Sequence, residues 1–394
     1  MEFICRSVHE QDYKILFDWK IIDRASQILQ EHGLGAPYFV ITDSNVFKHH
    51  GKHLQKALRP NQIHTLIVRP GETSKSLMNW KRIQDFLLSK GADRKSTVIA
   101  FGGGVVGDLA GFSASTFMRG LNFVQIPTTI LSQSDSSIGA KVAINHPLAK
   151  NLLGSFYQPK IILTDPSLLQ TLPKREFSAG LGEAIKYGVI ADPELFQSLF
   201  DKIDKLITGD RELLNNLIQR CIAIKIKVVE EDERETGVRK ILNFGHTIGH
   251  ALEQATGYKQ LRHGEAVGWG MLGAGWIAIQ RKMWSVQELG RLQSILLRSG
   301  CLYDPGNVTT KQIMNALKHD KKKSGKTLQF VLPEETGRVT IVKDLPRELV
   351  EEGIRMMFKL GTAKVLLMPE EDSAKRPQAR EDRFAPEIRA TKRN

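Results

Sequence analysis

Hydrophobic residues between positions 38 and 165 gather in short runs that are separated by longer amphipathic stretches. The runs lie at residues 38–42, 64–70, 96–103, 122–129 and 160–165, and the stretches between them include one of clear helical periodicity at 76–90. Short apolar runs that alternate with helical segments are typical of parallel strands whose connecting helices cover the sheet. The pattern therefore predicts an α/β domain built on a parallel sheet with helices on both faces.

The second half of the chain has a different pattern. Helical periodicity follows residue 173 over the stretches 176–190, 193–208, 211–232, 243–256, 263–282 and 285–299, and a small β pattern, LQFVLP with RVTIVKD, comes near the end. From residue 361 the chain mixes charge with proline and has no apolar period, which is typical of disorder. We expect an α/β domain over 1–172, a mostly α-helical domain over 173–360 and a disordered charged tail over 361–394.

Composition excludes several classes of protein. The chain is 41% hydrophobic and 25% charged, so wholesale disorder is excluded. The longest apolar stretch, 271–279, is too short to cross a membrane, and the N-terminus lacks the apolar core of a signal peptide, so we expect a cytoplasmic protein. The three cysteines are scattered, without metal or disulfide spacing. The net charge of +13 is spread along the chain with few aromatic residues, which favours a small anionic substrate over nucleic acid.

A glycine turn follows the run at 96–103. Gly102, Gly103 and Gly104 stand between the predicted strand and a segment that can be helical. Glycines let a phosphate approach the backbone, and the first N–H groups of a helix are unsatisfied donors. Pyrophosphate is the natural ligand, although three glycines can also form a simple tight turn. The dinucleotide fingerprint with its ribose-binding acid is not clearly present.

Polar side chains end two upstream runs and fill a later segment. Asp43 and Glu72 would lie at the carboxyl edge of the sheet, where they can bind ribose hydroxyls or, equally well, cap the helices that follow. Residues 135–151 include Lys141 and Lys150 in a loop-like stretch with glycine and proline. Each lysine alone is typical of solvated surface, whereas the group favours recognition of an oxyanion.

Histidines at helical spacing indicate a metal site. His246 and His250 stand four residues apart, on one face of a helix, and His263 and Glu265 open the next helix. Glu183 lies among small and apolar residues, where an unpaired charge is costly and a ligand role removes that cost. Histidine with carboxylate and without cysteine is typical of catalytic zinc. Spacing leaves open which three of the five bind the metal, and any single histidine can instead form hydrogen bonds between packed helices.

Long motifs in one order resemble the 3-dehydroquinate synthase family over about residues 38–340. They are FGGGVVGDLAGFSASTFMRG, QIPTTILSQSDSSIGAKVAIN, PLAKNLLGSFYQP, GLGEAIKYG, VVEEDERETGVRKILNFGHTIGHALE, HGEAV and HDKK. Two departures exchange small residues, because Ala140 and Gly182 stand where the family usually has glycine and alanine. We expect altered packing and retained chemistry at these positions.

The resemblance implies a metal- and NAD-dependent homodimer, with each role carried onto matching positions. It implies Zn²⁺ or Co²⁺ bound by Glu183, His246 and His263. The implied NAD contacts are Asp43, Asn45, Glu72, Lys75, Gly103, Gly104, Val105, Asp108, Thr128, Thr129, Asp135, Ser136, Lys141, Lys150, Thr171, Leu172 and Glu176. The implied substrate contacts are Asp135, Lys141, Asn151, Lys186, Lys225, Arg239, Asn243, His250 and one of Lys321 and Lys322, with Arg119 reaching into the neighbouring subunit's site.

The implied activity is that of a phosphate-eliminating lyase in the shikimate pathway, which supplies chorismate and the aromatic amino acids. The enzyme converts 3-deoxy-D-arabino-heptulosonate 7-phosphate to 3-dehydroquinate and phosphate by transient oxidation with NAD, elimination, reduction, ring opening and aldol closure. One alternative is another sugar-phosphate cyclase, such as a 2-deoxy-scyllo-inosose or valiolone synthase. A more distant one is a metal-dependent alcohol or glycerol dehydrogenase, which would release NADH and has little need for so many lysines.

Overall fold

The chain forms two compact units, and the computed structural model describes residues 1–7, 11–324 and 328–362, with the side chains of 319–324 left undescribed. The first unit consists of Met1–Pro173 and Cys221–Arg234. The second consists of Lys174–Arg220 and the described residues from 235 onward.

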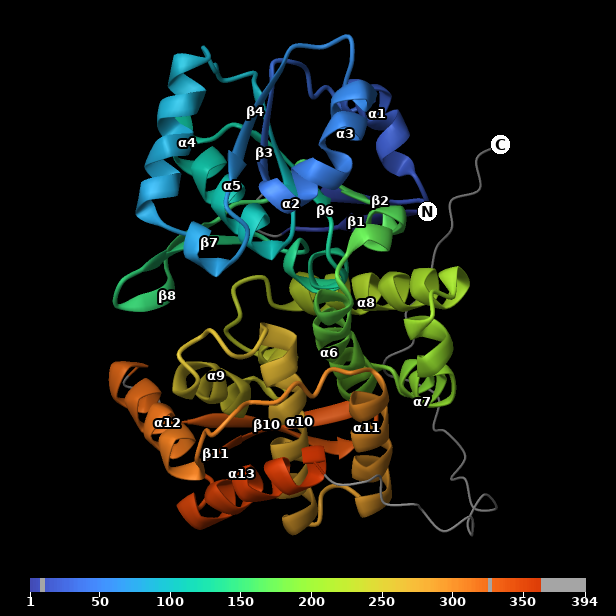
Figure 1. Ribbon diagram of the computed structural model, residues 1–394, viewed down its shortest axis with the longest axis vertical. Coiled ribbons are helices and arrows are strands. Elements are labelled where there is room, and N and C mark those ends of the chain that lie inside the picture. Colours follow the sequence, from blue (N-terminus) through green and yellow to red (C-terminus); the bar gives the residue numbers. More distant parts are fainter. Residues whose placement is uncertain (8–10, 325–327, 363–394) are drawn as a thin grey trace. The chain divides into compact units, whose positions relative to one another are not determined.

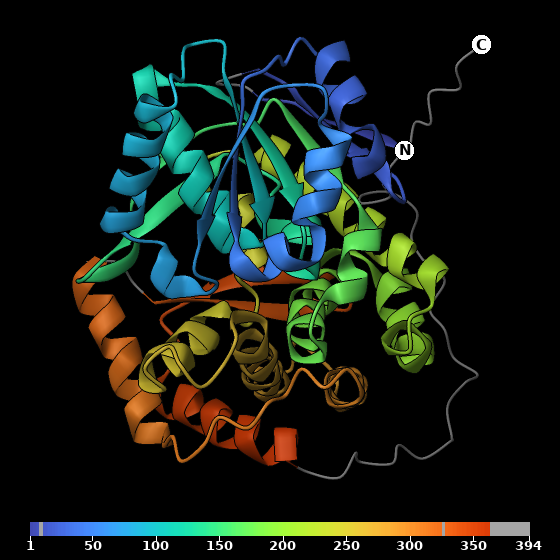
Figure 2. The same cartoon turned by 45° about the horizontal axis from the view of Figure 1, so that its top comes forward.

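A seven-stranded sheet forms the first unit, in the order β1-β2-β9-β6-β5-β3-β4 (Figure 1). β1 runs antiparallel to β2, and all other neighbouring strands are parallel. Helices lie on either side of the strands (Figure 2). The strands are β1 Glu2–Cys5, β2 Tyr13–Phe17, β3 Tyr38–Asp43, β4 Ile63–Val68, β5 Thr97–Gly102, β6 Asn122–Pro127 and β9 Ile161–Thr164. The helices are α1 Ala25–Glu31, α2 Ser44–Val46, α3 Lys52–Ala57, α4 Leu77–Ser89 and α5 Gly104–Thr116, with short helical turns at η1 Ile21–Arg24, η2 Phe47–Gly51, η3 Glu72–Ser74, η4 Phe117–Arg119, η5 Ser132–Ser136 and η6 Pro166–Thr171.

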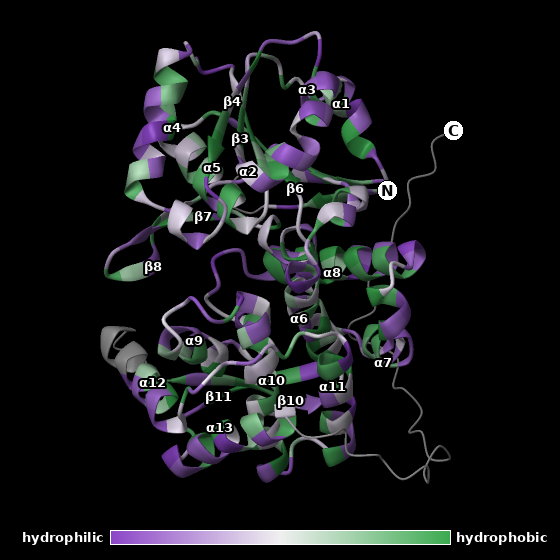
Figure 3. Cartoon of the chain, viewed as in Figure 1, coloured by the Kyte–Doolittle hydropathy of each residue, from purple (hydrophilic) through white to green (hydrophobic). Residues whose placement is uncertain are grey.

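Strand β3 shows why the apolar runs are continuous. Phe39 and Ile41 pack into a core with residues of α4 and α5, whereas Tyr38 and Val40 pack into a second core with residues of α1 and α3. Successive side chains of a strand point to opposite faces, so a sheet covered on both faces needs apolar residues at every position. The hydropathy colouring shows these strands as apolar ribbons between helices of mixed character (Figure 3). The predicted parallel α/β sheet is confirmed.

The segment expected to be a loop, residues 135–151, is largely a hairpin. β7 Lys141–His146 pairs antiparallel with β8 Ala149–Phe156. Most β8 side chains are exposed and many are polar or small, so the strand lacks the apolar pattern by which strands are recognised. The loop prediction is wrong here, and Lys141 and Lys150 stand on paired strands.

The second unit is mostly helical, as predicted. Helix α10, which is buried almost throughout, packs against α6, α9, α11, α13 and β10. The small β pattern near the end is a two-stranded hairpin. The elements are α6 Lys174–Ala191, α7 Pro193–Ile207, α8 Arg211–Glu231, η7 Val238–Asn243, α9 His246–Ala255, α10 His263–Gln280, α11 Val286–Arg298, α12 Thr310–Ser324, β10 Gln329–Glu335, β11 Arg338–Lys343 and α13 Arg347–Thr362.

The boundaries of the two units differ in one respect from a simple division near residue 172. The first unit ends at Pro173 but regains Cys221–Arg234, which includes the second part of α8. Lys225 in this segment donates to Asp135 Oδ1 at 2.5 Å.

Helix α13 continues to Thr362, and the expected tail beyond it, 363–394, lies outside the described residues. No helix in the described part of the chain is long and apolar enough to span a membrane.

Candidate active site

The glycine turn of the first unit connects β5 to α5. Gly103 precedes the first residue of α5, and no side chain caps that helix. A Cβ atom added at Gly103 would lie 3.0 Å from Thr129 Cγ2, and one at Gly104 would lie 2.9 Å from Ser136 Oγ. Side chains at these two positions would therefore crowd the two hydroxyl-bearing residues that approach the turn. The structure thus brings together four of the predicted NAD contacts beside a helix N-terminus, the arrangement that binds pyrophosphate.

Thr128 adds an unsatisfied group at this edge of the sheet. Its N–H donates to Gly102 O at 3.0 Å, which joins the ends of β5 and β6. Its Oγ1 atom is buried and has no hydrogen-bond partner among the described residues. A buried polar atom without a partner is costly, so a ligand hydroxyl or phosphate at this position would satisfy it.

Asp43, whose role the sequence left open, caps a helix. Its Oδ1 atom accepts hydrogen bonds from the backbone N–H groups of Asn45 at 2.8 Å and Val46 at 3.1 Å. Oδ2 takes part in neither bond, so capping leaves one carboxylate oxygen for another partner. Glu72, the second such acid, accepts from Asn145 Nδ2 at 2.7 Å. The two readings of Asp43 are therefore compatible.

Lys75 lies at the centre of a polar cluster in the first unit. Its buried ammonium donates to Asp108 Oδ2 and to Asn151 Oδ1, each at 2.5 Å. Burial raises the pKa of Asp108, although the nearby Lys75 charge opposes that shift. The cluster joins two predicted NAD contacts, Lys75 and Asp108, with Asn151, a predicted substrate contact. Sequence spacing did not indicate this grouping.

His50 is a residue that the sequence analysis missed. The end of η6 brings Thr171 to this side chain, and the two side chains form a 2.6 Å hydrogen bond between His50 Nε2 and Thr171 Oγ1. Leu172 follows directly, whereas Glu176 belongs to the second unit, where its carboxylate pairs with Arg262 at 2.7 Å. The signal for His50 was weak, because it lies in a run of histidine and lysine that is typical of a solvated surface.

Three helices bring a carboxylate and two imidazoles together in the second unit. Glu183 on α6 is almost fully buried, and its Oε1 atom lies 3.3 Å from Nε2 of His246 and 3.3 Å from Nε2 of His263. Oε1 forms no hydrogen bond of acceptable geometry. His250 completes the group, since one ring nitrogen from each of the three histidines lies within 4.8 Å of the others.

These residues fit a divalent cation. An anionic oxygen and imidazole nitrogens converge on one point here, and their lone pairs are not engaged in hydrogen bonds with the described residues. This is the donor set of a zinc or cobalt centre. Glu265, which spacing left as a candidate, is used elsewhere, because Arg175 donates to both of its oxygens at 2.7 and 2.9 Å. Its Oε2 atom also caps α10 by accepting from Arg262 N at 2.8 Å.

Burial and neighbouring charges act in opposite directions on the groups of this cluster. Burial alone would raise the pKa of Glu183, but the charges of Lys186 and His246 hold it well below its usual range. Burial alone would lower the pKa of His263, yet its contacts with Glu183 and Glu253 raise it to about 10. Desolvation of the ring and then the charges of His246 and His263 lower the pKa of His250, although the residue is exposed. The surroundings therefore favour positive charge at His263, between two carboxylates, and disfavour it at His250.

Backbone contact between α6 and α10 sets the spacing of the cluster. A Cβ atom added at Gly264 would lie 1.9 Å from Ala179 O, and one at Gly182 would lie 2.3 Å from Gly264 O. An alanine at residue 182 does not fit this packing, which gives the Gly182 departure a physical reason. The close approach places Glu183 beside the first residue of α10, His263.

Three of the predicted substrate contacts, Lys186, Lys225 and Arg239, are buried cations. Lys186 donates to Glu183 Oε2, Lys225 pairs with Asp135, and Arg239 is buried in η7. Asn243 donates to Glu235 Oε1 at 2.9 Å. The lysines thus hold counter-charges that an anionic ligand can replace.

The predicted roles of Arg119 and of the lysine at 321 or 322 cannot be read from the side chains described in a single subunit. Arg119 ends η4 with a φ of 67°, and its predicted role is in a neighbouring subunit. The backbone of Lys321 and Lys322 belongs to α12, but their side chains lie outside the described residues.

Known proteins are similar to this chain over most of its length. The sequence model for the 3-dehydroquinate synthase N-terminal region matches residues 65–179, and that for the C-terminal region matches residues 180–323. A curated 3-dehydroquinate synthase from Nostoc punctiforme is 40% identical over 353 residues, 88% of this chain and 97% of the relative. One from Caldanaerobacter subterraneus subsp. tengcongensis is 42% identical over 344 residues, 87% of this chain and 97% of the relative.

Solved structures show the same fold. A 2-epi-5-epi-valiolone synthase from Streptomyces hygroscopicus subsp. jinggangensis, with NAD⁺ and Zn²⁺ bound, has a TM-score of 0.82 at 26% identity and covers 90% of this chain and 99% of its own. A 2-deoxy-scyllo-inosose synthase with carbaglucose-6-phosphate, NAD⁺ and Co²⁺ has the same TM-score, identity and coverage. A glycerol dehydrogenase from Schizosaccharomyces pombe shares the fold alone, at a TM-score of 0.61 and 17% identity, and covers 88% of this chain and 89% of its own. On both family models and on relatives matched nearly end to end, this chain belongs to the 3-dehydroquinate synthase family.

Proposed function

We propose that this protein is a 3-dehydroquinate synthase, which converts 3-deoxy-D-arabino-heptulosonate 7-phosphate to 3-dehydroquinate and phosphate. The observation that carries the proposal is the match to curated 3-dehydroquinate synthases at about 40% identity over nearly their whole length. The protein then acts as a phosphate-eliminating lyase in the shikimate pathway, and we propose a cytoplasmic homodimer.

Glu183, His246 and His263 are the proposed metal ligands. The support is the unsatisfied Oε1 atom of Glu183, which lies 3.3 Å from an imidazole nitrogen of each histidine. A bound Zn²⁺ or Co²⁺ supplies Lewis acidity toward a substrate hydroxyl. His250 stands one turn from His246 on α9 and is the proposed catalytic neighbour of the metal.

The glycine turn and the residues around it are the proposed NAD site. Backbone N–H groups at the start of α5 donate to the pyrophosphate, and Thr128, with its unpaired hydroxyl, donates beside them. Asp43 keeps one oxygen for a ribose hydroxyl while the other caps α2. NAD supplies a reversible hydride acceptor, so no net reduction of the cofactor accompanies turnover.

Buried cations are proposed to bind the substrate's phosphate and carboxylate. Lys186, Lys225 and Arg239 are each less than a tenth exposed, and a charge in such a place must be paired. Glu183 and Asp135 pair with the two lysines in this structure. A dianionic phosphate and a carboxylate would replace or extend these pairs through charge-assisted hydrogen bonds, which orient the substrate and favour departure of phosphate.

Substrate preference tests the proposal against the related cyclases. We expect the heptulosonate phosphate to be used far better than glucose 6-phosphate or sedoheptulose 7-phosphate, which lack its carboxylate. Because Arg239 is proposed to bind the substrate carboxylate, Arg239→Ala should lower kcat/KM for the heptulosonate by about 10- to 100-fold and shrink the gap. Arg69→Ala, a change in the loop after β4, is the control for general loss of positive charge. Faster turnover of either carboxylate-free sugar would reassign the protein to an inosose or valiolone synthase.

A further inference from the structure

Helix α9 presents a third polar side chain on the face that carries His246 and His250. Glu253 follows His246 by seven residues, and in a helix positions i, i+4 and i+7 lie on one face. Its side chain is only 7% exposed. A carboxylate buried to this degree requires a specific partner, because burial of an unpaired charge is costly.

One partner of the Glu253 carboxylate is His263 on α10. The Nδ1 atom of His263 lies 3.1 Å from Glu253 Oε2, and its Nε2 atom lies 3.3 Å from Glu183 Oε1. The imidazole is therefore held between two carboxylates from two other helices, one at each ring nitrogen.

The two nitrogens of a neutral imidazole cannot play the same part. When Nδ1 carries the proton and donates it to Glu253, Nε2 keeps a lone pair that is free to bind a cation. Histidines that bind metals usually donate their second ring N–H to a carboxylate or a carbonyl, which fixes the tautomer and the ring orientation. His246 shows the alternative within the same cluster, since its Nδ1 atom lies 3.1 Å from Phe244 O, a backbone carbonyl.

Close helix packing fixes Glu253 in place. A Cβ atom added at Gly249, one turn before Glu253, would lie 2.9 Å from Ala266 O on α10. The backbone of Glu253 also accepts a hydrogen bond from Tyr258 N at 2.8 Å, which ends the helix. The carboxylate is thus held on a rigid element, as a positioning group must be.

From this geometry we infer that Glu253 is a positioning residue, which holds His263 in the Nδ1–H tautomer with Nε2 directed toward the metal. The inference rests on the proposed metal site and adds to it a residue outside the predicted set. It gives a role to a carboxylate that is buried beside the cluster.

Metal affinity and metal spectroscopy test the role. We expect Glu253→Gln to weaken Zn²⁺ binding about 10- to 100-fold, measured by competition with a chromophoric chelator, and to change the visible spectrum of the Co²⁺-loaded protein. Glu253→Asp, which restores the charge on a shorter side chain, should recover part of both. The thermal midpoint of each metal-free variant reports separately on folding.

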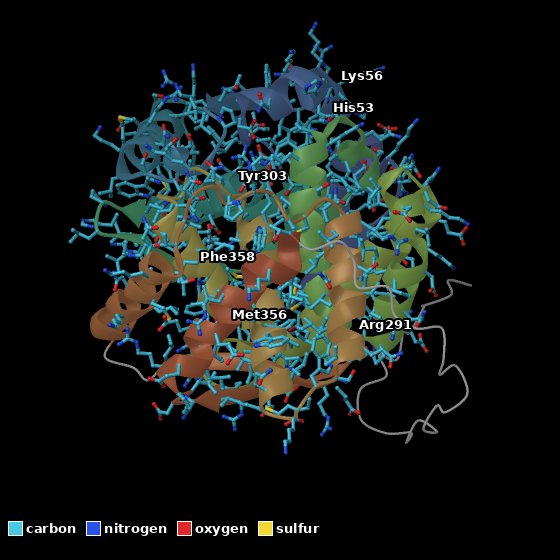
Figure 4. The ribbon with its side chains drawn as sticks, turned by 60° about the horizontal axis from the view of Figure 1, so that its bottom comes forward. His53, Lys56, Arg291, Tyr303, Met356 and Phe358 are labelled. Carbon is cyan, nitrogen blue, oxygen red and sulfur yellow. The ribbon has the colours of Figure 1, made fainter. Side chains whose placement is uncertain are left out.

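Asp23→Asn is the matched control. It removes the carboxylate that pairs with the ring of His53 in the first unit. The His53 side chain is 42% exposed and lies near the outer edge of the drawn side chains in Figure 4. Metal affinity and the Co²⁺ spectrum should not change. Wild-type affinity and an unchanged spectrum in folded Glu253→Gln would overturn the inference while leaving the metal site in place. Absence of metal binding in the wild type would overturn both.

A measurement on the wild type removes dependence on a folded variant. With ¹⁵N-labelled histidine and Zn²⁺ bound, the ring signals of His263, assigned by their loss in His263→Ala, should show a protonated Nδ1 and a metal-bound Nε2. A protonated Nε2 with metal at Nδ1 would contradict the role of Glu253 directly.

Discussion

The two oxygens of Glu183 have different surroundings. Oε2 accepts from the buried ammonium of Lys186, whereas Oε1 faces two imidazoles without a hydrogen bond. One carboxylate can therefore serve a metal on one side and a cation on the other. Loss of Lys186 or of the metal would leave the buried charge of Glu183 partly uncompensated, so Glu183 and Lys186 should tolerate little substitution.

Removing a proposed ligand should remove the metal. We expect Glu183→Gln, His246→Ala and His263→Ala to lose most bound metal and activity after dialysis, because three ligands are needed to hold the ion. His250→Ala should retain the metal and lose turnover. Metal content per chain, measured by atomic emission, decides. A fully occupied His263→Ala variant would contradict the assignment.

An ion pair between α7 and α11 should appear in the acid limb of stability. Hydrogen bonds from Arg298, the shortest to Oδ2, hold the pKa of Asp204 below its ordinary value. A lowered carboxyl pKa stabilises the fold above the unfolded-state pKa, and this contribution is lost as pH falls through the folded-state value. The effect is small, because the Asp204 side chain is 67% exposed.

The measurement for this pair is the urea midpoint at neutral pH and at successive acid pH values. Asp204→Asn should lower the midpoint slightly at pH 7 and reduce its dependence on pH in the acid range. The neutral variant cannot titrate, so an acid limb identical to that of the wild type would show that Asp204 contributes nothing to it.

Sequence reasoning at the residue scale reached the chemistry of the cluster but not its second layer of contacts. Spacing identified five candidate ligands, and the structure separates Glu265 from them because Arg175 occupies its carboxylate. Glu253 escaped notice, since its spacing from His246 carries meaning only once α10 is known to lie opposite. His50 escaped because pairing with Thr171 joins residues 121 positions apart.

At the scale of elements, glycines let helices touch where ligands must converge. Gly264 on α10 meets the backbone of α6 at Ala179, and Gly270 on the same helix meets the backbone at Gly245, just before α9. The two contacts bring three ligand-bearing segments within reach of one ion. Packing of this kind permits no added methyl group without movement of a helix.

Gly264→Ala tests this role of backbone contact. The new Cβ atom would lie 1.9 Å from Ala179 O, so we expect a loss of stability of about 1–3 kcal/mol or more, together with weaker metal binding. Gly35→Ala is the control, because a Cβ atom there meets nothing within 4 Å and Gly35 has no positive φ. Chemical denaturation of both proteins gives the comparison. Equal stability of the two variants would show that α6 can move without cost.

Most of the longer helices and the apolar strands were predicted from the sequence, but the amphipathic helix α13 Arg347–Thr362 was missed. The five apolar runs are β3, β4, β5, β6 and β9. Strands buried on both faces, such as β3, β5 and β9, are continuously apolar, whereas β4 at the sheet edge is only partly buried. The β7–β8 hairpin lacks this signal because β8 exposes most of its side chains. The pair β1 and β2 was also missed, because two short strands before the first clear run give little pattern. Helix α9 begins at His246, three residues later than its periodicity suggested.

For the whole molecule, the order of the two units along the chain was predictable, but the return of residues 221–234 to the first unit was not. Helix α8 runs without a break from Arg211 to Glu231, so nothing in its periodicity marks the point at which Cys221 rejoins the first unit. That assignment depends on pairings such as Lys225 with Asp135, which lie 90 residues apart. Long-range pairs of this kind are invisible to local patterns.

The proposed homodimer predicts complementation between inactive subunits. If Arg119 acts in the neighbouring subunit's site, mixing Arg119→Ala with His250→Ala subunits should restore activity, because a hybrid dimer contains one complete site. Statistical exchange would give roughly a quarter of wild-type activity. Size-exclusion chromatography with light scattering establishes the dimer and the exchange. No recovery after verified exchange would assign Arg119 to its own subunit.

The central claim, that this chain is a cyclase in which NAD is used but not consumed, is tested most directly by following phosphate and NADH together. Purified protein is supplied with Zn²⁺, the heptulosonate phosphate and NAD far below the substrate concentration. A cyclase returns the hydride to the same substrate molecule, so phosphate should accumulate over many turnovers beyond the NAD present while NADH absorbance shows no net rise. NADH that rises in step with oxidised substrate and stops when NAD is exhausted would contradict the account and indicate a dehydrogenase.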